Sequence, residues 1–347
     1  MQSPEELYAA ALDEGVLTIY TVSTRMLDVA ASFEAEYPGL SVKVLDIRAD
    51  ELANMVADDA LSGAGGCDLI FCTDVDGAIS RNFIPNGLAH AYFPPDIADK
   101  LTDTSGGQMT PVVAEIIAIA YNDAVYSQPP VSNWWALTQP EWYGRVYCPN
   151  PARSVTTLAA FTTMLQYEAL WAQSYEEYYG KPFADETGEG AAKAYLRALV
   201  ENGLFITNSS DEVIEAEGAP SNQSPGIGIM VSSKLRMREI GYSVAPVYDA
   251  APYCGVVNPI HIMIADGSPN VNSAKLFVRW LLGEADGQGA GYAPYLQNGA
   301  WSMRTDVDSQ AEVALAGLDV RYTDGAFVYD RKAELLDFWQ QLIAENY

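Results

Sequence analysis

The amino-acid sequence predicts an α/β fold built on parallel strands, and three observations support this prediction. Between residues 16 and 72, short apolar runs typical of strands alternate with segments whose apolar residues recur at helical spacing. This strand–helix–strand order implies parallel strands joined by right-handed crossovers. The chain has 347 residues, which suits two domains better than one small core, and 49% of them are hydrophobic, as in globular proteins.

The elements at the beginning of the chain are expected in a regular order. A first helix begins at Ser3, which forms a capping sequence with Pro4 and Glu6, and it ends at Gly15. Strands are expected at residues 16–21, 40–45 and 67–72, and helices from Ser23 or Thr24 to the Pro38–Gly39 turn and at residues 50–61. The buried face of the second helix is expected to carry Met26, Val29, Ala30 and Phe33.

Polar residues follow two of these strands. The first strand is followed by Ser23, Thr24 and Arg25, and the third strand is followed by Thr73 and Asp74. Ligands of parallel α/β sheets bind at the carboxyl ends of the strands. These five residues are therefore candidate ligand-binding residues.

The rest of the chain continues the alternation. Further strands are expected at residues 112–122, 145–148, 226–231 and 256–265. Further helices are expected at residues 134–138, 189–201 and 331–343, after Pro151, and after a Gly-x-Pro-Asn turn at 267–270. The Tyr-rich stretch at residues 174–183 is polar, and its adjacent pair Tyr178 and Tyr179 is expected at the surface.

The helix start after residues 145–148 is the most informative local feature. Its first turn is expected to carry Arg153, Ser154, Thr156 and Thr157. A helix start attracts anions through unpaired backbone N–H groups and a partial positive charge, so these side chains would make an anion cradle. The alternative is that Ser154 serves only as the cap of the helix.

Two further pairs of serines lie at the ends of predicted elements. Ser209 and Ser210 precede a short helix, although Ser209 with Glu212 also fits an ordinary capping box. Ser232 and Ser233 follow a predicted strand. Hydroxyl donors and helix-start amides suit phosphate, phosphonate or carboxylate groups, to which an arginine adds bidentate geometry.

The charge of the chain excludes one class of partner. The 46 acidic and 19 basic residues give a net charge of −27, which argues against nucleic acid or an anionic membrane as partner. The acidic residues are dispersed along the chain, as is typical of a solvated surface. The same charge opposes an anionic ligand, so a local cluster of donors would have to outweigh it.

Catalytic and metal-binding patterns are sparse. The sequence contains no G-x-S-x-G, H-E-x-x-H or P-loop motif, so no enzymatic activity is expected. Asp74 and Asp76 could form a carboxylate pair, or they could serve the local hydrogen bonds of a turn. The chain has two histidines, His90 and His261, and no C-x-x-C pair, so no zinc site is expected. His261 is expected to be structural.

The four cysteines are expected to be buried thiols. Cys67 and Cys72 would lie about 16 Å apart on opposite faces of one strand, which excludes a disulfide between them. The sequence does not decide whether Cys148 and Cys254 form a disulfide. No run of about 18 apolar residues exists that could span a membrane. The N-terminal sequence MQSPEEL lacks the basic start and apolar core of a signal peptide.

An ordered set of residues resembles a known family. The set consists of Trp134, Leu137, Pro140, Trp142, Gly144 and Val146, followed by Pro151, Ser154 and Thr156. It resembles the bacterial ABC-transporter solute-binding proteins related to the ferric-binding and hexose-phosphate-binding proteins. Residues 267–282 and 302–307 match later segments of the same family, so the resemblance runs in order over nearly the whole chain.

The resemblance implies a type II periplasmic-binding-protein fold, with two α/β lobes, two hinge crossovers and a ligand cleft between the lobes. Lobe 1 would comprise residues 1–117 plus 258–308, and lobe 2 residues 118–257 plus 309–347. The implied function is to capture a small solute for the membrane permease of an ABC importer, without a cofactor. A monomer outside the cytoplasm is expected, periplasmic or lipid-anchored at the cell surface. A ligand-sensing module for a receptor or two-component system is the alternative.

The resemblance also bears on the ligand. The iron-binding members carry two adjacent tyrosines after the strand that matches residues 226–231, and this chain has Ser232 and Ser233 there. A phosphorylated, phosphonate or carboxylate solute is therefore expected in preference to ferric ion. A thiamine-like compound is a further alternative.

Overall fold

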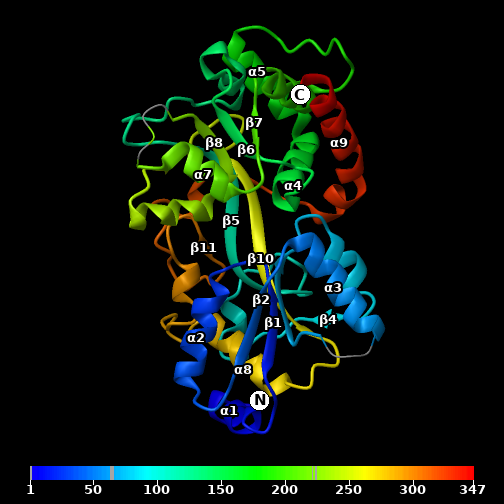
Figure 1. Cartoon of the computed structure of the whole chain (residues 1–347), viewed down its shortest axis with the longest axis vertical. Helices are drawn as coiled ribbons and strands as arrows, with labels where there is room; N and C mark the ends of the chain where they lie inside the picture. Colours follow the sequence, from blue (N-terminus) through cyan, green and yellow to red (C-terminus); the bar gives the residue numbers. More distant parts are fainter. Residues whose placement is uncertain (1, 63–65, 221, 223–224) are drawn as a thin grey trace. The chain divides into compact units, whose positions relative to one another are not determined.

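The computed structural model describes residues 2–62, 66–220, 222 and 225–347, and the chain divides into two compact units. Unit 1 comprises Met1–Ala114 and Pro259–Ala311, and unit 2 comprises Glu115–Asn258 and Glu312–Tyr347. Two long strands, β5 (Thr110–Tyr121) and β10 (Gly255–Ala265), each begin in one unit and end in the other (Figure 1). Unit 1 is thus assembled from two separate parts of the chain.

The sheet of unit 1 contains the predicted parallel strands. Its order is β2 (Val42–Asp46), β1 (Leu17–Thr21), β3 (Leu69–Thr73) and the second part of β10. Strand β1 is parallel to both neighbours, with Ile19 opposite Val44 and Leu69, whereas β10 is antiparallel to β3. The short strands β4 (Ala89–His90) and β11 (Trp301–Ser302) pair with β10 and β5. The parallel arrangement predicted for residues 16–72 is confirmed.

The helices of unit 1 include the four that were predicted, and the second of them begins at Met26 instead of Ser23 or Thr24. They are α1 (Pro4–Ala11), α2 (Met26–Glu36), α3 (Ala49–Ser62), α8 (Val271–Leu281) and the short η1 (Ile79–Phe83), η2 (Ala98–Lys100) and η7 (Ala293–Tyr295). The capping box of α1 is present, because Glu6 N donates to Ser3 Oγ and Ser3 N donates to the Glu6 carboxylate. The four residues predicted for the buried face of α2 are all buried. One of them, Phe33, packs against Phe277 of α8 with ring centroids 5.0 Å apart.

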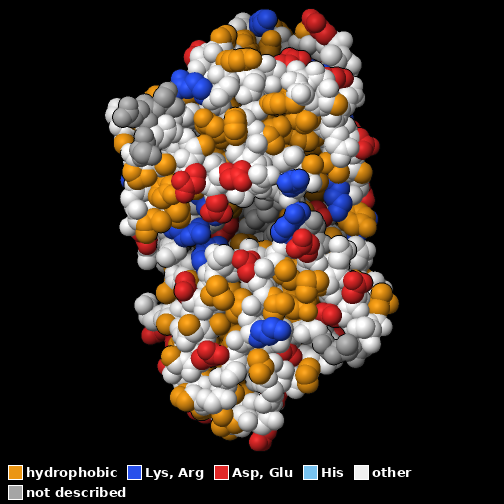
Figure 2. Space-filling model, in the orientation of Figure 1, with side chains coloured by type: hydrophobic (Ala, Val, Ile, Leu, Met, Phe, Trp, Pro, Cys, Tyr) orange, Lys and Arg blue, Asp and Glu red, His pale blue; other side chains and the backbone are white. Residues whose placement is uncertain are grey.

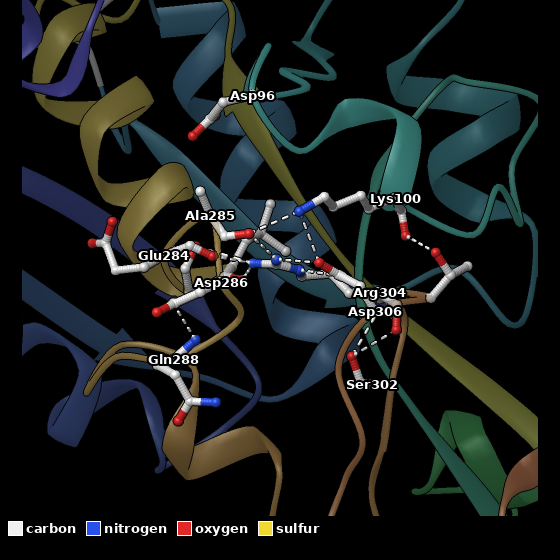
Figure 3. Close-up of polar contacts among 12 residues, drawn as sticks. Asp96, Lys100, Glu284, Ala285, Asp286, Gln288, Ser302, Arg304 and Asp306 are labelled. Carbon is white, nitrogen blue, oxygen red and sulfur yellow. Dashed lines mark hydrogen bonds and ion pairs between the residues drawn. The ribbon is translucent and has the colours of Figure 1, made fainter.

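A buried arginine ties the end of α8 to the segment after β11 (Figure 3). The Arg304 side chain is fully buried, and its Nη1 donates to the carbonyls of Leu282 at 2.8 Å, Gly283 at 3.2 Å and Glu284 at 2.7 Å. Its Nε and Nη2 donate to the two carboxylate oxygens of Asp306 at 3.0 and 2.9 Å. All three nitrogens are engaged within the fold, so this charged cluster is structural.

The sheet of unit 2 has the order β7 (Phe205–Thr207), β6 (Val146–Pro149), β8 (Ile227–Val231) and the second part of β5. Strand β6 is parallel to β7 and β8, and Tyr147 lies opposite Phe205 on one side and Gly228 on the other. Strand β5 is antiparallel to β8. The short strands β9 (Ala245–Pro246) and β12 (Val320–Tyr322) pair with β5 and β10.

Unit 2 is rich in helices. They are η3 (Trp134–Thr138), η4 (Pro140–Trp142), α4 (Val155–Met164), η5 (Leu165–Tyr167), α5 (Glu168–Tyr179), α6 (Ala191–Glu201), α7 (Ser210–Gly218), η6 (Ser232–Ile240), η8 (Leu315–Gly317) and α9 (Gly325–Asn346). Helix α9 lies beside α4, where Trp339 packs against Phe161 (Figure 1). It begins six residues before the predicted residue 331, because the Asp324 side chain caps it by accepting hydrogen bonds from Ala326 N and Phe327 N.

The polar stretch at residues 174–183 is helical in its first part. Its residues up to Tyr179 belong to α5. Tyr175 lies against Trp135 with ring centroids 5.0 Å apart, and Tyr179 receives a hydrogen bond from Gln139 Nε2 at 2.7 Å. Tyr178 is exposed, as predicted, but Tyr179 is half-buried. The aromatic side chains of α5 thus contribute to the core of unit 2.

All four cysteines are buried and free, so no disulfide joins Cys148 to Cys254. Burial raises the pKa of each thiol above its ordinary value. His261 is buried in β10, and its Nε2 lies 2.8 Å from the Thr104 hydroxyl. Burial lowers the pKa of His261 to about 4, so the ring is neutral near pH 7. These contacts agree with a structural role for His261.

Candidate functional site

Three parallel strands of unit 2 end at the same edge of its sheet, because β6 is parallel to both β7 and β8. Two hydrogen bonds join the segments at this edge. Asn150 N donates to the carbonyl of Thr207 at 2.9 Å, and Val231 N donates to Ser210 Oγ at 3.5 Å. The structure therefore brings together eight of the predicted site residues: Arg153, Ser154, Thr156, Thr157, Ser209, Ser210, Ser232 and Ser233.

The start of α4 carries a compact group of hydroxyls. Ser154 is the N-cap, and its Oγ accepts a hydrogen bond from Thr157 N at 3.3 Å. The same oxygen lies 3.1 Å from the Thr156 hydroxyl and 2.9 Å from the Thr157 hydroxyl. The capping role of Ser154 is thus confirmed. It is compatible with anion binding, because a helix leaves its first backbone N–H groups without partners inside the helix.

Arg153 lies just before this helix and not in its first turn. It precedes the N-cap because the loop after β6 closes its own turn, in which Arg153 N and Ser154 N both donate to the carbonyl of Asn150 at 2.9 Å. The guanidinium is exposed, and its Nη1 donates to Asn208 Oδ1 at 3.0 Å. This contact links the loop before α4 to the loop before α7.

The start of α7 differs from that of α4 in its charge. The first turn of α7 contains Asp211 and Glu212, whereas the first turn of α4 contains no acidic residue. Ser209 Oγ accepts from Glu212 N at 3.3 Å, and the Glu212 carboxylate accepts from Asn208 N at 2.8 Å. The carboxylates of α7 therefore occupy the place that an anion would take. This favours the capping interpretation for Ser209.

Ser232 and Ser233 serve the fold at the end of β8. Both are buried. Ser232 Oγ accepts from Ile116 N at 2.9 Å, and Ser233 Oγ donates to the Glu115 carboxylate at 3.0 Å. The two hydroxyls thus attach the start of η6 to β5, and this is a role that the sequence pattern did not predict.

Two basic residues at this edge were not predicted as part of the site. Lys234 Nζ lies 2.5 Å from Asp211 Oδ1, and Arg236 Nη1 donates to the carbonyl of Ser233 at 2.6 Å. Burial lowers the pKa of Lys234, and the neighbouring Asp211 opposes that shift. The sequence does contain a signal for them, since SSKLRMRE places three bases at alternate positions in an acidic chain.

In unit 1, the residues after β1 contact a tyrosine that is distant in sequence. The Tyr295 hydroxyl donates to Ser23 Oγ at 3.2 Å, and the guanidinium of Arg25 lies 4.4 Å from the centre of the Tyr295 ring. Arg25 is buried. The carbonyls of Ser23 and Thr24 accept hydrogen bonds from the first two N–H groups of α2. No local sequence pattern pointed to Tyr295, which comes from η7.

The residues after β3 form a hydrogen-bonded turn. The two carboxylate oxygens of Asp74 accept from Ile79 N at 2.7 Å and Ser80 N at 3.1 Å, and Asp76 accepts from Ala78 N at 3.3 Å. These contacts confirm the turn interpretation for the two aspartates. Burial raises the pKa of Asp74 to about 6, although the hydrogen bonds from Ser80 and Ile79 oppose that shift.

Within residues 2–62, 66–220, 222 and 225–347, no group of three or more His, Cys, Asp or Glu side chains is placed to hold a metal ion. Within the same ranges, no helix has the length and hydropathy needed to cross a membrane.

Three solved structures illustrate the fold similarity. Iron-bound HitA from Pseudomonas aeruginosa is 16% identical, with a TM-score of 0.70 over 94% of this chain and 99% of that chain. The substrate binding protein of an ABC transporter from Agrobacterium tumefaciens is 13% identical, with a TM-score of 0.70 over 95% and 94%. AfuA from Actinobacillus pleuropneumoniae, with exogenous fructose-6-phosphate bound, is 19% identical, with a TM-score of 0.65 over 95% and 99%. At these identities the similarity shows the fold alone.

The family of the chain is shown by a match between its sequence and a family model. The family model for bacterial extracellular solute-binding proteins matches residues 20–288, from β1 to beyond α8. No curated protein matches the chain. The predicted two-lobed α/β fold and the predicted resemblance are both confirmed. The chain belongs to the family of bacterial extracellular solute-binding proteins.

Proposed function

We propose that this chain is the solute-binding component of an ABC importer and that it captures a small anionic organic solute outside the cytoplasm. Membership of the family supports the transport role. The observation that supports an anionic solute is the start of α4, where Arg153 and three hydroxyls surround a helix terminus whose first turn has no acidic residue.

The chemistry of this helix start suits a phosphate, phosphonate or carboxylate group. Backbone N–H groups and the partial positive charge of the helix attract the anion, and the hydroxyls of Ser154 and Thr156 can donate to its oxygens. Arg153 adds a planar pair of donors that match such a group in bidentate geometry. The start of α7 is a poorer candidate, because its own carboxylates already lie there.

The negative charge of the whole chain does not exclude an anionic solute. Asp and Glu side chains are scattered over the face shown in Figure 2 and are not gathered in one patch. At physiological ionic strength the field of an exposed charge is screened within about 8 Å. The charges that matter most to the solute are therefore its immediate neighbours, among which Arg153 is positive.

We also propose that units 1 and 2 are the two lobes implied by the family. In unit 1, Ser23, Thr24 and Thr73 lie at the carboxyl ends of β1 and β3, where α/β sheets bind ligands. Their hydroxyls both donate and accept, which suits an uncharged polar part of the solute.

An organic anion is a better candidate than ferric ion. The titles of the similar structures name iron for HitA and fructose-6-phosphate for AfuA, so the fold alone does not decide the ligand. In this chain, the Ser232 and Ser233 hydroxyls bond to the backbone of Ile116 and the side chain of Glu115. At the two positions where iron-binding relatives are expected to carry tyrosines, this chain thus has serines whose hydroxyls are engaged in hydrogen bonds within the fold.

The test begins with a ligand screen and ends with a variant. Thermal-shift measurements with phosphorylated sugars, phosphonates, carboxylates, thiamine and Fe(III) would identify a ligand, and calorimetry would give its affinity. Charge-assisted hydrogen bonds contribute about 1.5–3 kcal/mol each, so Arg153→Ala should weaken binding by about ten- to a hundredfold. Arg331→Ala is the matched control, because Arg331 is an exposed arginine of α9 that pairs with Glu334. Unchanged affinity of Arg153→Ala would refute the proposed site.

A further inference from the structure

Helix α7 buries the carboxyl group of Glu217 against its sheet. Glu217 is fully buried, and neither carboxyl oxygen has a hydrogen-bond partner within the described part of the chain. Helix α7 contacts β6, β7 and β8. A Cβ atom placed on Gly228 of β8 would stand only 2.7 Å from Glu217 Oε2. The glycine therefore provides the space that the carboxyl group occupies.

The surroundings of this carboxyl group are apolar or negatively charged. Val213 and Ile214 of α7 and Met230 of β8 form one buried cluster on this side of the sheet. The charged group that acts on Glu217 is Asp123, which pairs with Arg238 at 2.8 Å. The remaining titratable side chains on these elements are Tyr147 and the neutral thiol Cys148 on β6, Lys234, Arg236 and Glu239 on η6, and Tyr242 just after η6. Strands β7 and β8 carry none.

The remaining bases near α7 are engaged elsewhere. Lys234 pairs with Asp211 at the opposite end of α7, and Arg236 donates to the carbonyl of Ser233. Asn122 Nδ2 donates to the backbone carbonyl of Glu217 at 3.0 Å and not to its side chain. An ionised Glu217 would therefore be a buried charge without a compensating partner, which is strongly unfavourable.

We propose that Glu217 is protonated in the folded protein and that its protonation is a pH-sensitive switch. Helix α7 stays packed on the sheet while the carboxyl group is neutral. Ionisation of Glu217 would draw the end of α7 toward water and loosen its packing on β8. The other end of α7 follows Asn208, which is hydrogen-bonded to Arg153. Ionisation of Glu217 would thus disturb the loop before α4 as well.

The direction of the pH effect follows from linkage. Burial, and to a smaller degree Asp123, raise the pKa of Glu217 well above its ordinary value of 4.5. Between that value and the folded-state pKa, the folded protein binds the proton and the unfolded protein does not. Stability therefore falls as pH rises through this interval, and the folding equilibrium constant drops by up to tenfold for each pH unit.

The test compares Glu217→Gln with the wild-type protein between pH 5 and pH 9. Glutamine has nearly the same shape and cannot ionise, so the ratio of the two folding constants should grow by up to tenfold per pH unit. Urea denaturation monitored by tryptophan fluorescence reports mainly the unfolding of unit 2, because this unit contains five of the seven tryptophans. Glu215→Gln is the matched control, because Glu215 is an exposed residue of the same helix and should follow the wild type.

A second measurement needs neither a variant nor a ligand. Infrared spectra of the folded wild-type protein should show a protonated carboxyl group at pH 8, where exposed carboxyl groups are ionised. Its absence, or a ratio of folding constants that does not change with pH, would overturn the proposal. Neither result bears on the proposed solute site, since both measurements are made without a solute.

Discussion

Replacing Arg304 by methionine should destabilise unit 1 more than any surface substitution. The guanidinium is fully buried and donates to four carbonyls in the segment after α8 and to both oxygens of Asp306 (Figure 3). Methionine fills a similar volume but donates nothing, so buried carbonyls lose their partners. Removing one partner of a buried charged network costs about 3–5 kcal/mol.

The expected value lies at the lower end of this range. Asp306 remains partly exposed and keeps an ion pair with Lys100 at 2.9 Å, so its carboxylate is not left buried and alone. We expect a loss of about 3 kcal/mol in the free energy of unfolding. For a domain of this size, each kcal/mol lowers the melting temperature by about 2–4 °C, which gives a decrease of about 6–12 °C.

Differential scanning calorimetry would measure this decrease, and hydrogen exchange of the α8 amides would locate it. Arg331→Met is the control, because exposed ion pairs contribute about 0–1 kcal/mol. Arg304 lowers the pKa of Asp306 below its ordinary value of 3.8. Part of the stability from this contact should therefore be lost as the pH falls below that value. A variant that melts within about 2 °C of the wild type would refute this account of Arg304.

Two other outcomes are expected. Ser233→Ala should lower stability by about 1.5–3 kcal/mol in denaturant titrations, because the buried Glu115 carboxylate loses a hydrogen bond; an equally large effect of the partly buried Ser243→Ala would contradict a specific role. With a net charge of −27, the melting temperature should rise between about 10 and 150 mM NaCl, as the Debye length falls from about 30 to 8 Å. A melting temperature independent of salt over that range would count against charge repulsion as a destabilising factor.

Local patterns were sufficient to predict the first three strands of unit 1 and its helices α1, α2, α3 and α8. Apolar residues spaced at three and four positions identified the buried face of α2, and the Ser-Pro-x-Glu pattern identified the cap of α1. The stretch at residues 174–183 was harder, because acidic residues alternate with tyrosines in it. Tyr175 and Tyr179 become half-buried by packing against aromatic neighbours such as Trp135, about 40 residues earlier in the chain.

The sequence predicted which residues lie at the candidate site better than it predicted what their side chains do there. Parallel strands bring their carboxyl ends to one edge, and this general rule was enough to gather seven serines and threonines and one arginine. It could not show that Ser233 bonds to Glu115 or that Tyr295 stacks on Arg25, because each pair is separated by more than 100 residues. Such pairings depend on how distant elements pack, which no local spacing records.

The division of unit 1 into two parts of the chain affects the order in which it can fold during synthesis. Strand β3 ends at Thr73, but its partner in β10 begins about 190 residues later, after most of unit 2. At about 5–20 residues per second, the ribosome needs roughly 10–40 s to make that intervening stretch. Throughout this time one edge of a buried strand lacks its partner, and such edges promote aggregation. The nascent first unit therefore has to remain soluble with this strand edge unpaired until β10 has been synthesised.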